Sequence, residues 1–180
     1  MSLQPGTQTL GPGHGSIEVR TYREGIAQKV GHDLIIDVER WEAVVDVGES
    51  GVPSSIQLQV EPRSLRVREG LHGVKPLTDK DRTEIRKTID EKILGGQPIA
   101  FRSQAVEPRD GRLHVRGELT IAGTTRPAAF ELELASDGRI GGTLEIVQSQ
   151  WGIKPYRGFM GALKVRDAVE LRLDVGPSAG

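Results

Sequence analysis

Apolar and polar residues alternate along most of the chain. In the second half, apolar side chains occupy every second position of four runs, 113–121, 130–134, 140–146 and 169–175. The positions between them carry mostly polar side chains. A period of two predicts β-strands with one apolar and one solvent-facing side. We therefore expect each of these runs to form such a strand.

Short turn segments separate these runs. Residues 108–111, 122–125 and 136–138 each contain glycine, which accepts the positive φ of a tight turn. Links this short join antiparallel neighbours. The second half of the chain is therefore predicted to be an up-and-down antiparallel sheet.

The first half shows the same alternation in the runs 16–23, 28–39, 40–47 and 54–61, and it returns at 98–106. Residues 1–15 are rich in glycine and proline, and we expect them to form a mobile N-terminal segment. No shift of composition divides the remainder. Residues 16–176 are therefore expected to form a single domain.

One segment has a helical period instead. Ile85, Ile89 and Ile93 are spaced four apart, which places them on one stripe of a helix. Thr78 is a suitable N-cap, and Gly95 follows the last apolar residue, where helices commonly end. The pattern predicts one amphipathic helix over 78–94 that lies against the sheet.

Many antiparallel strands with one apolar face can form a sandwich or a closed barrel. The even series of strands and its short turns favour the barrel, because closure removes unpaired edges. The predicted fold class is thus all-β with one helix, a lipocalin-like antiparallel barrel of about eight strands. A barrel of about that size either fills with side chains or holds one small ligand.

Composition narrows the functions that need to be considered. The chain has 24 basic and 25 acidic residues without a basic block, so we expect no nucleic-acid partner. Absence of cysteine excludes disulfides and thiolate metal sites. The first residues do not resemble a signal peptide, and no apolar run reaches the roughly 20 residues of a membrane-spanning helix. We therefore expect a cytoplasmic protein without a membrane span.

Catalytic and metal-binding patterns are weak. The four histidines, His14, His32, His72 and His114, are scattered without the spacing of a metal motif. Ser149 lies in no Gly-x-Ser-x-Gly motif and has no neighbouring base in the sequence. We expect no catalytic residue and no metal site.

Four segments, in order along the chain, resemble the YceI-like family of lipocalin-like, polyisoprenoid-binding proteins. The most specific is 115–127, with the pattern Gly-x-Leu-Thr-apolar-x-Gly-x-Thr-x-Pro. The others are the Pro-apolar-x-Phe-x-Ser strand at 98–103, the Ser-x-aromatic-Gly-Ile run at 149–153, and the closing strand at 165–171. A histidine motif at 31–34 is a weaker match.

The resemblance implies an elongated apolar pocket in the barrel for an isoprenoid tail, as in polyprenyl lipids and quinones. We expect a non-enzymatic protein that binds, transports or stores such a lipid-like small molecule and uses no other cofactor. The residues expected to contact the ligand are Ile17, Val19, Leu34, Ile36, Trp41, Phe101, Leu113, Val115, Gly117, Leu119, Phe130, Leu132, Gly142, Leu144, Ile146, Trp151 and Phe159.

Gly117 and Gly142 interrupt two apolar strand faces. Glycine at such positions relieves strain at a bulge or kink. It also leaves out side-chain volume and so makes space for a ligand. The sequence is compatible with both interpretations.

The loop 152–161 carries Tyr156, Phe159 and Met160 between glycines. Its aromatic side chains either fold back onto the barrel or form a lid or a homodimer contact, because apolar loop tips often mark a binding surface. Two other functions stay open: a small-molecule enzyme on a barrel scaffold, and a filled barrel that acts as a protein-interaction module. An apolar cavity favours the carrier, a convergent polar cluster the enzyme, and a filled interior the module.

Overall fold

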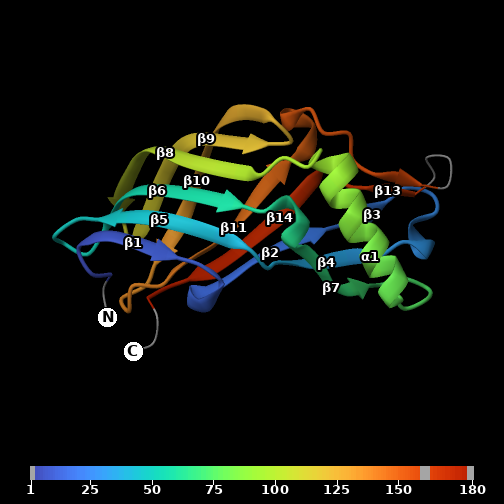
Figure 1. The fold of residues 1–180 in the computed structure, drawn as a ribbon, viewed down its shortest axis with the longest axis horizontal. Coiled ribbons are helices and arrows are strands. Elements are labelled where there is room, and N and C mark those ends of the chain that lie inside the picture. Colours follow the sequence, from blue (N-terminus) through green and yellow to red (C-terminus); the bar gives the residue numbers. More distant parts are fainter. Residues whose placement is uncertain (1–2, 159–162, 178–180) are drawn as a thin grey trace.

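The computed structural model describes residues 3–158 and 163–177. Its main element is one strongly curled antiparallel sheet (Figure 1), with the strand order β1-β5-β6-β8-β9-β10-β11-β14-β2-β4-β7. These strands are β1 (Gly6–Leu10), β2 (Gly15–Thr21), β4 (Asp33–Val38), β5 (Trp41–Val47), β6 (Pro53–Val60), β7 (Leu65–Leu71), β8 (Ile99–Arg109), β9 (Arg112–Ile121), β10 (Thr124–Leu134), β11 (Ile140–Val147) and β14 (Ala168–Val175). The predicted all-β class and antiparallel connections are confirmed.

Three pairs of these strands are halves of longer bent strands. β1 continues into β2 through a short 3-10 turn, η1 (Pro12–His14), and β4 continues into β5 across only two residues. β6 continues into β7 through a second 3-10 turn, η3 (Pro62–Ser64). With each bent pair counted as one, β1/β2, β4/β5 and β6/β7 join β8, β9, β10, β11 and β14 to make eight strands.

Antiparallel strand pairing continues around the whole barrel. β1/β2 pairs with β4/β5 along both halves, and β4/β5 pairs likewise with β6/β7. β6 pairs with β8 on its other side, and β14 pairs with β2. The expected barrel of about eight strands is therefore present, although bends divide it into eleven shorter segments.

Two of the bends are joined by hydrogen bonds. The Glu61 amide donates to the Arg40 carbonyl at 3.1 Å, and the Glu39 amide donates to the Ser64 carbonyl at 2.9 Å. The Ser64 hydroxyl, in a side chain only 2% exposed, donates to the carbonyls of Arg40 and Glu61. Backbone groups that lose their partners at a bend thus find new ones in the neighbouring bend.

Strand β1 lies within the segment that we expected to be mobile. It pairs with β5 over five positions, and its last residue, Leu10, and the preceding Leu3 are buried. The Thr7 hydroxyl donates to the carboxylate of Asp46 on β5 at 2.7 Å. The sequence pattern did not predict this strand because Gly6–Leu10 has no apolar alternation. Pairing with β5 holds these residues in the extended conformation.

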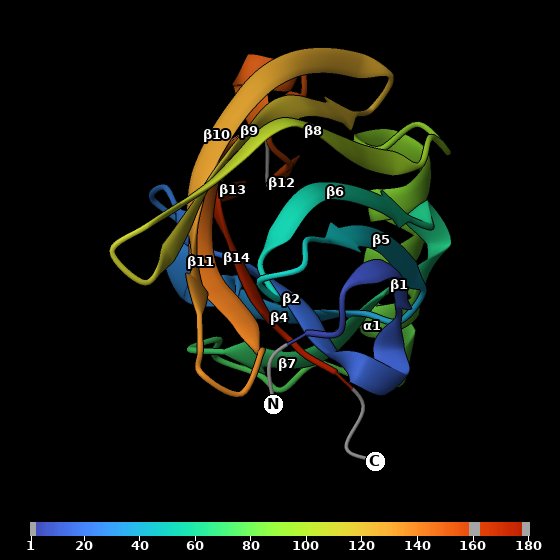
Figure 2. The ribbon, with the colours of Figure 1, turned by 90° about the vertical axis from the view of Figure 1, so that its left-hand side faces the viewer.

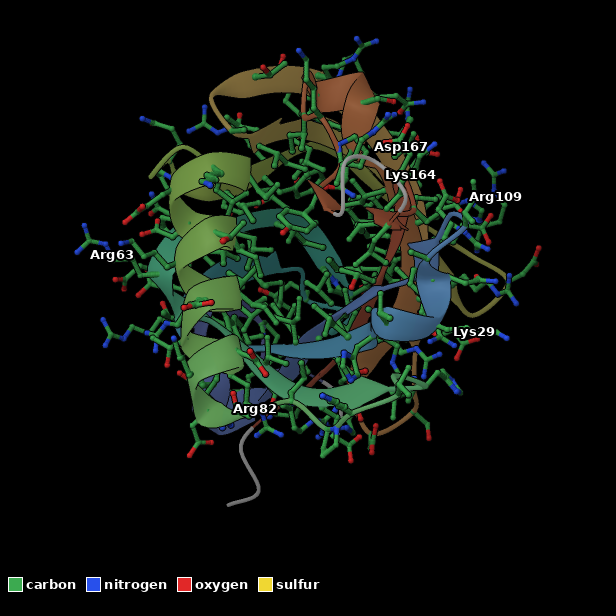
Figure 3. The ribbon with its side chains drawn as sticks, turned by 90° about the vertical axis from the view of Figure 1, so that its right-hand side faces the viewer. Lys29, Arg63, Arg82, Arg109, Lys164 and Asp167 are labelled. Atoms are coloured by element: carbon green, nitrogen blue, oxygen red, sulfur yellow. The ribbon has the colours of Figure 1, made fainter. Side chains whose placement is uncertain are left out.

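The predicted helix is confirmed in place and in orientation. It comprises α1 (Asp79–Thr88) and a π-helical continuation, η4 (Ile89–Ile93), and Thr78 caps its start by accepting a hydrogen bond from the Asp81 amide. Ile85, Ile89 and Ile93 pack against the core. Figure 3 shows α1 standing along one side of a barrel end, with Arg63 pointing outward. Arg86 Nε donates to the Arg63 carbonyl at 2.6 Å, which fastens the helix to the bend at η3.

A small second sheet lies at the same end. Its strands are β12 (Arg157–Gly158), β13 (Leu163–Val165) and β3 (Arg23–Glu24). Arg23 Nη1 donates to the carbonyls of Gln28, Gly31 and His72, and His32 contacts the Lys75 carbonyl through Nε2 at 2.6 Å. The histidine motif therefore ties two loops of this end together.

A pH-dependent test follows from the Asp46 carboxylate, which accepts hydrogen bonds from the hydroxyls of Thr7 and Ser55. These bonds, the one from Thr7 foremost, lower the pKa of Asp46 below its ordinary value of 3.8. A lowered folded-state pKa contributes stability above the unfolded value, and this stability is lost as the pH falls through the folded value.

We expect Asp46→Asn to lower the melting temperature at about pH 7, and the difference from the wild type to narrow toward about pH 3. Thermal unfolding followed by circular dichroism measures it. Glu42→Gln, on the same outward face of β5, is the matched control and should show no such convergence. A difference that stays constant with pH would contradict the role of the Asp46 charge.

Candidate ligand cavity

The barrel interior contains a cavity of about 500 Å³. Residues from both halves of the chain line it: Leu10, Ile17, Trp41, Ala43, Val45, Ile56, Leu58, Phe101, Leu119, Pro127, Ala128, Ala129, Phe130, Glu131, Leu132, Ile140, Thr143, Leu144, Glu145, Ile146, Val147, Gln150, Trp151, Leu171, Leu173 and Val175. Most of these side chains are aliphatic or aromatic, as the inward faces of alternating strands require. The volume lies within the range of roughly 300–1,000 Å³ that is typical of small-molecule sites.

Nine of the expected ligand contacts lie in this lining, namely Ile17, Trp41, Phe101, Leu119, Phe130, Leu132, Leu144, Ile146 and Trp151. They come from six strands and from the 3-10 turn η5 (Gln148–Trp151). Phe101 and Phe130 pack together in the wall, with ring centroids 5.0 Å apart and planes tilted by 51°. The structure thus brings together side chains that are up to 134 residues apart in the sequence (Ile17 and Trp151).

Other expected contacts lie outside the lining. Ile36, Leu113 and Val115 are at most 2% exposed and are packed in the core, while Val19 and Leu34 are half-buried against it. These side chains are on the inward faces of their strands as expected, but neighbouring side chains separate them from the cavity. Phe159 and Met160 lie outside the described residues.

Several lining residues were not among the contacts expected from the sequence. Ala43 and Val45 follow Trp41 on the inward face of β5, and Ile56 and Leu58 face them from β6. On β14 the inward Leu171, Leu173 and Val175 complete the wall. Each of them belongs to an alternating run, so period two could have identified them as interior residues but not as cavity-lining ones.

Gly117 is a packing glycine and does not line the cavity. It lies opposite Ser103 in β8, where the register of the β8–β9 pair shifts between Ser103 and Ala105. A Cβ at this position would collide with the carbonyl oxygen of Arg102 and lie 2.8 Å from the Phe101 ring. The interpretation of Gly117 as missing volume for a ligand is therefore wrong, and the bulge interpretation is confirmed.

Gly142 also lies outside the cavity lining. A Cβ there would come within 3.1 Å of a Leu132 methyl group and 3.4 Å of the Glu131 carbonyl oxygen. This glycine allows β10 and β11 to approach closely near their shared turn.

The segment η5 closes one side of the cavity. The Trp151 indole N–H donates to the Leu119 carbonyl at 2.8 Å, and its ring is 6% exposed. The Ser149 amide donates to the Asp167 carboxylate at 2.7 Å, and the Ser149 hydroxyl donates to the same group. Gly152 ends the turn with φ 72°. Ser149 and Asp167, both in segments that resemble the family, therefore hold η5 in place.

The most specific of these segments forms the β9–β10 hairpin. Ala122 and Gly123 both have positive φ, which suits a two-residue turn between antiparallel strands. The hydroxyls of Thr120 and Thr125 hydrogen-bond across the pair at 2.7 Å. These residues determine how the two strands meet.

Charged and polar side chains do not converge in the cavity. Of the lining residues that the structure describes, only Glu131 and Glu145 are charged, and the exposed Glu131 carboxylate pairs with Arg112 at 3.0 Å and His114 at 3.2 Å. Within residues 3–158 and 163–177, no group of three or more His, Asp or Glu side chains could hold a metal ion. Ser149 is engaged by Asp167 rather than by a histidine.

A second hollow of about 130 Å³ lies on the outer face of the sheet. Glu18, Asp37 and Arg68 line it, and Arg68 forms ion pairs with both carboxylates. This is a partly exposed ladder of opposite charges on neighbouring strands. Such pairs stabilise cross-strand register modestly and do not form a site.

Exposed apolar side chains occur mainly in the loops of the α1 end. Tyr156 is 46% exposed and lies in the loop that the sequence analysis considered as a lid. No helix in the described part of the chain combines the length and the apolar character that crossing a membrane requires.

Comparison with known proteins relates this barrel to one family. The family model of the YceI-like domain matches residues 38–176. No protein with curated annotation matches the chain. Among solved structures, BcnA of Burkholderia cenocepacia is similar, with a TM-score of 0.64 and 16% identity over 89% of this chain and 94% of BcnA.

Two further similar structures come from Campylobacter jejuni. Its YCEI protein has a TM-score of 0.56 and 13% identity, over 78% of this chain and 81% of that protein. A mutant of the same protein with a monobromobimane guest has a TM-score of 0.57 and 14% identity over the same shares. At these identities the likeness shows a shared fold.

The packing role of Gly117 can be tested directly. We expect Gly117→Ala to reduce the free energy of unfolding by about 2 kcal/mol or more, because the new methyl group meets backbone atoms that cannot move aside alone. Gly142→Ala should cost about 1 kcal/mol or less, since a flexible leucine can give way. Urea unfolding measures both, with Glu118→Ala on the outer face as control. Wild-type stability of Gly117→Ala would contradict the close packing.

Proposed function

The chain belongs to the YceI-like domain family, and from this premise we propose that it is a non-enzymatic binding protein for an apolar small molecule held inside the barrel. The observation that carries the proposal is the cavity of about 500 Å³ with its largely apolar lining. An interior filled by side chains would have favoured an interaction module instead. The cavity is the feature that a carrier needs and a module does not.

Hydrophobic burial supplies the binding energy in this proposal. At ~25 cal/mol per Å², a ligand that buries roughly 300 Å² of apolar surface gains about 7 kcal/mol before the cost of immobilisation. The aliphatic walls of β5, β6 and β14 offer many contacts, and the Phe101–Phe130 pair offers flat ones. This lining suits branched aliphatic chains and planar rings alike.

We propose an isoprenoid lipid, such as a quinone or a polyprenyl alcohol, as the ligand, and its transport or storage as the role. The resemblance of the sequence motifs supports this class, and the branched methyl groups of an isoprenoid suit a wall of leucine, isoleucine and valine. The cavity volume limits the enclosed part to the size of a small molecule, so a long tail would extend beyond it.

The charged lining residues bear on the head group. Both Glu131 and Glu145 are carboxylates, and the lining contains no lysine or arginine. A carboxylate or phosphate head group in the cavity would be repelled, most strongly by Glu145, because Arg112 and His114 pair with Glu131 from outside the lining. We therefore propose that the head group is uncharged.

The position of the ligand can be tested by filling the cavity. Ala43→Leu and Ala128→Leu add volume at two lining positions on opposite walls, and we expect binding of a fluorescent apolar probe to fall at least tenfold. The melting temperature should stay close to that of the wild type, because the added atoms occupy empty space. Val44→Leu, on the other face of β5, is the control. Unchanged probe binding in both folded variants would mean that the ligand lies elsewhere.

The uncharged head group can be tested with a matched ligand pair. A long-chain alcohol should bind at least tenfold more tightly than the fatty acid of equal chain length at about pH 7, because only the acid is repelled by the two carboxylates. Displacement of the fluorescent probe measures both affinities. Glu145→Gln should reduce the difference in affinity between the alcohol and the acid. Equal affinities in the wild type would contradict the proposal of an uncharged head group.

A further inference from the structure

Strands β10 and β11 separate soon after their shared turn. They pair at only two positions, Glu133 with Gly141 and Leu134 with Ile140. On its other side β10 pairs with β9 over ten positions, and β11 pairs with β14 over eight. The barrel wall is therefore continuous on both sides of a gap, and one edge of each strand has no strand partner there among the residues that the structure describes.

The cavity reaches this gap. Along most strands, only inward-facing residues line the cavity, such as Trp41, Ala43 and Val45 on β5. On β10 and β11, by contrast, the lining includes the consecutive residues 127–132 and 143–147. Consecutive residues point to opposite faces of a strand, so both can border one space only where that space passes the strand edge. The cavity therefore opens sideways between β10 and β11, the two strands that lie on the left in Figure 2.

The exposure of the inward-facing side chains also indicates an opening between β10 and β11. The inward-facing Ala128 and Phe130 on β10 and Leu144 and Ile146 on β11 are only half-buried. On neighbouring β9, which is paired on both sides, the inward-facing Leu119 is 7% exposed. Solvent thus approaches the apolar interior along the gap.

The sequence of β10 fits an unpaired edge. Pro127 lies within the strand and keeps its place in the β9 ladder opposite Glu118 without a register shift. Proline cannot donate a backbone hydrogen bond, so within sheets it is confined to positions whose nitrogen faces an open edge. The proline of the family-like segment therefore lies where β10 has no strand to pair with.

The ends of the barrel do not offer the cavity a comparable opening. No residue that the structure describes in α1, β4 or β7 lines the cavity, so the cavity does not extend to the end beside α1. Toward the opposite end, Leu3 precedes β1 and is 2% exposed, and Val47 is 6% exposed. In the part of the chain that the structure describes, buried side chains therefore lie at this end, and the cavity stops short of the other.

We propose that the gap between β10 and β11 is the portal through which the apolar ligand enters and leaves the cavity. This inference rests on the proposed binding function and adds the route. Phe130 lies beside the gap and packs on Phe101, so its ring borders the route. Thr143, Glu145 and Gln150 are exposed on the rim, where they contact the polar head group of a ligand whose tail lies inside.

Cross-linking the two strands tests the portal. The chain has no cysteine, so introduced thiols are the only ones present. Continuing the register of the two pairs places Ala129 opposite Glu145, and both side chains are exposed. The variant Ala129→Cys with Glu145→Cys is joined by a bismaleimide that contains a reducible disulfide. We expect the cross-link to slow association and dissociation of a fluorescent apolar probe at least tenfold, and reduction to restore both rates.

The control joins two strands that are already paired. Arg102 lies opposite Glu118 on β8 and β9, and both side chains are exposed and outside the cavity lining. Cross-linking Arg102→Cys with Glu118→Cys should leave both rates unchanged. If the linked portal variant exchanges the probe as fast as the unlinked one, the portal is overturned and the binding function stands. If wild-type protein binds no apolar probe, both proposals fall.

Discussion

Pairing in an antiparallel barrel has to pass from the last strand back to the first, and in this protein bent strands make that possible. β1 turns into β2, β4 into β5 and β6 into β7, so that one strand can serve two parts of the wall. The bends at Arg40 and Ser64 satisfy each other's backbone groups, which removes the cost of unpaired buried donors and acceptors. Without these bends the sheet would stay open and could enclose no cavity.

A closed barrel of eight strands leaves an interior that side chains nearly fill, so small differences in packing decide where space remains. Near β4 and β7, Ile36 and Val67 are almost fully buried and leave no room. Farther along the barrel, the small side chains of Ala43 on β5 and Ala128 on β10 and the early separation of β10 from β11 leave the cavity. The motifs shared with the family lie around this region, where Gly117, Trp151 and Asp167 hold the bulge and η5.

The apolar cavity and the gap between β10 and β11 serve the two parts of one ligand. A ligand that binds by burial of apolar surface needs walls without polar groups, and those walls give a polar head group nothing to bond. An opening between two strands resolves this, because the rim offers hydroxyl, amide and backbone groups while the interior stays apolar. The unpaired edges of β10 and β11 are tolerated there since solvent reaches them, and Pro127 keeps one such edge from donating to a foreign strand.

Period two by itself determined most of the strands, their inward faces and hence eight of the cavity-lining residues, because alternation is a local property of each run. The ninth, Trp151, lies in the turn η5 and was indicated by the resemblance to the family. The Ile85-Ile89-Ile93 stripe likewise determined the helix. The sequence could not reveal β1, whose order comes from Asp46 and β5, or the filled state around Leu113 and Val115, which depends on distant neighbours. Gly117 is the clearest example. The alternation predicts that it lies on the inward face of its strand, but only the tertiary structure places the Arg102 carbonyl against it. Whether a barrel interior is packed or hollow, and where it opens, depends on strands that meet in space, so only the fold could decide it.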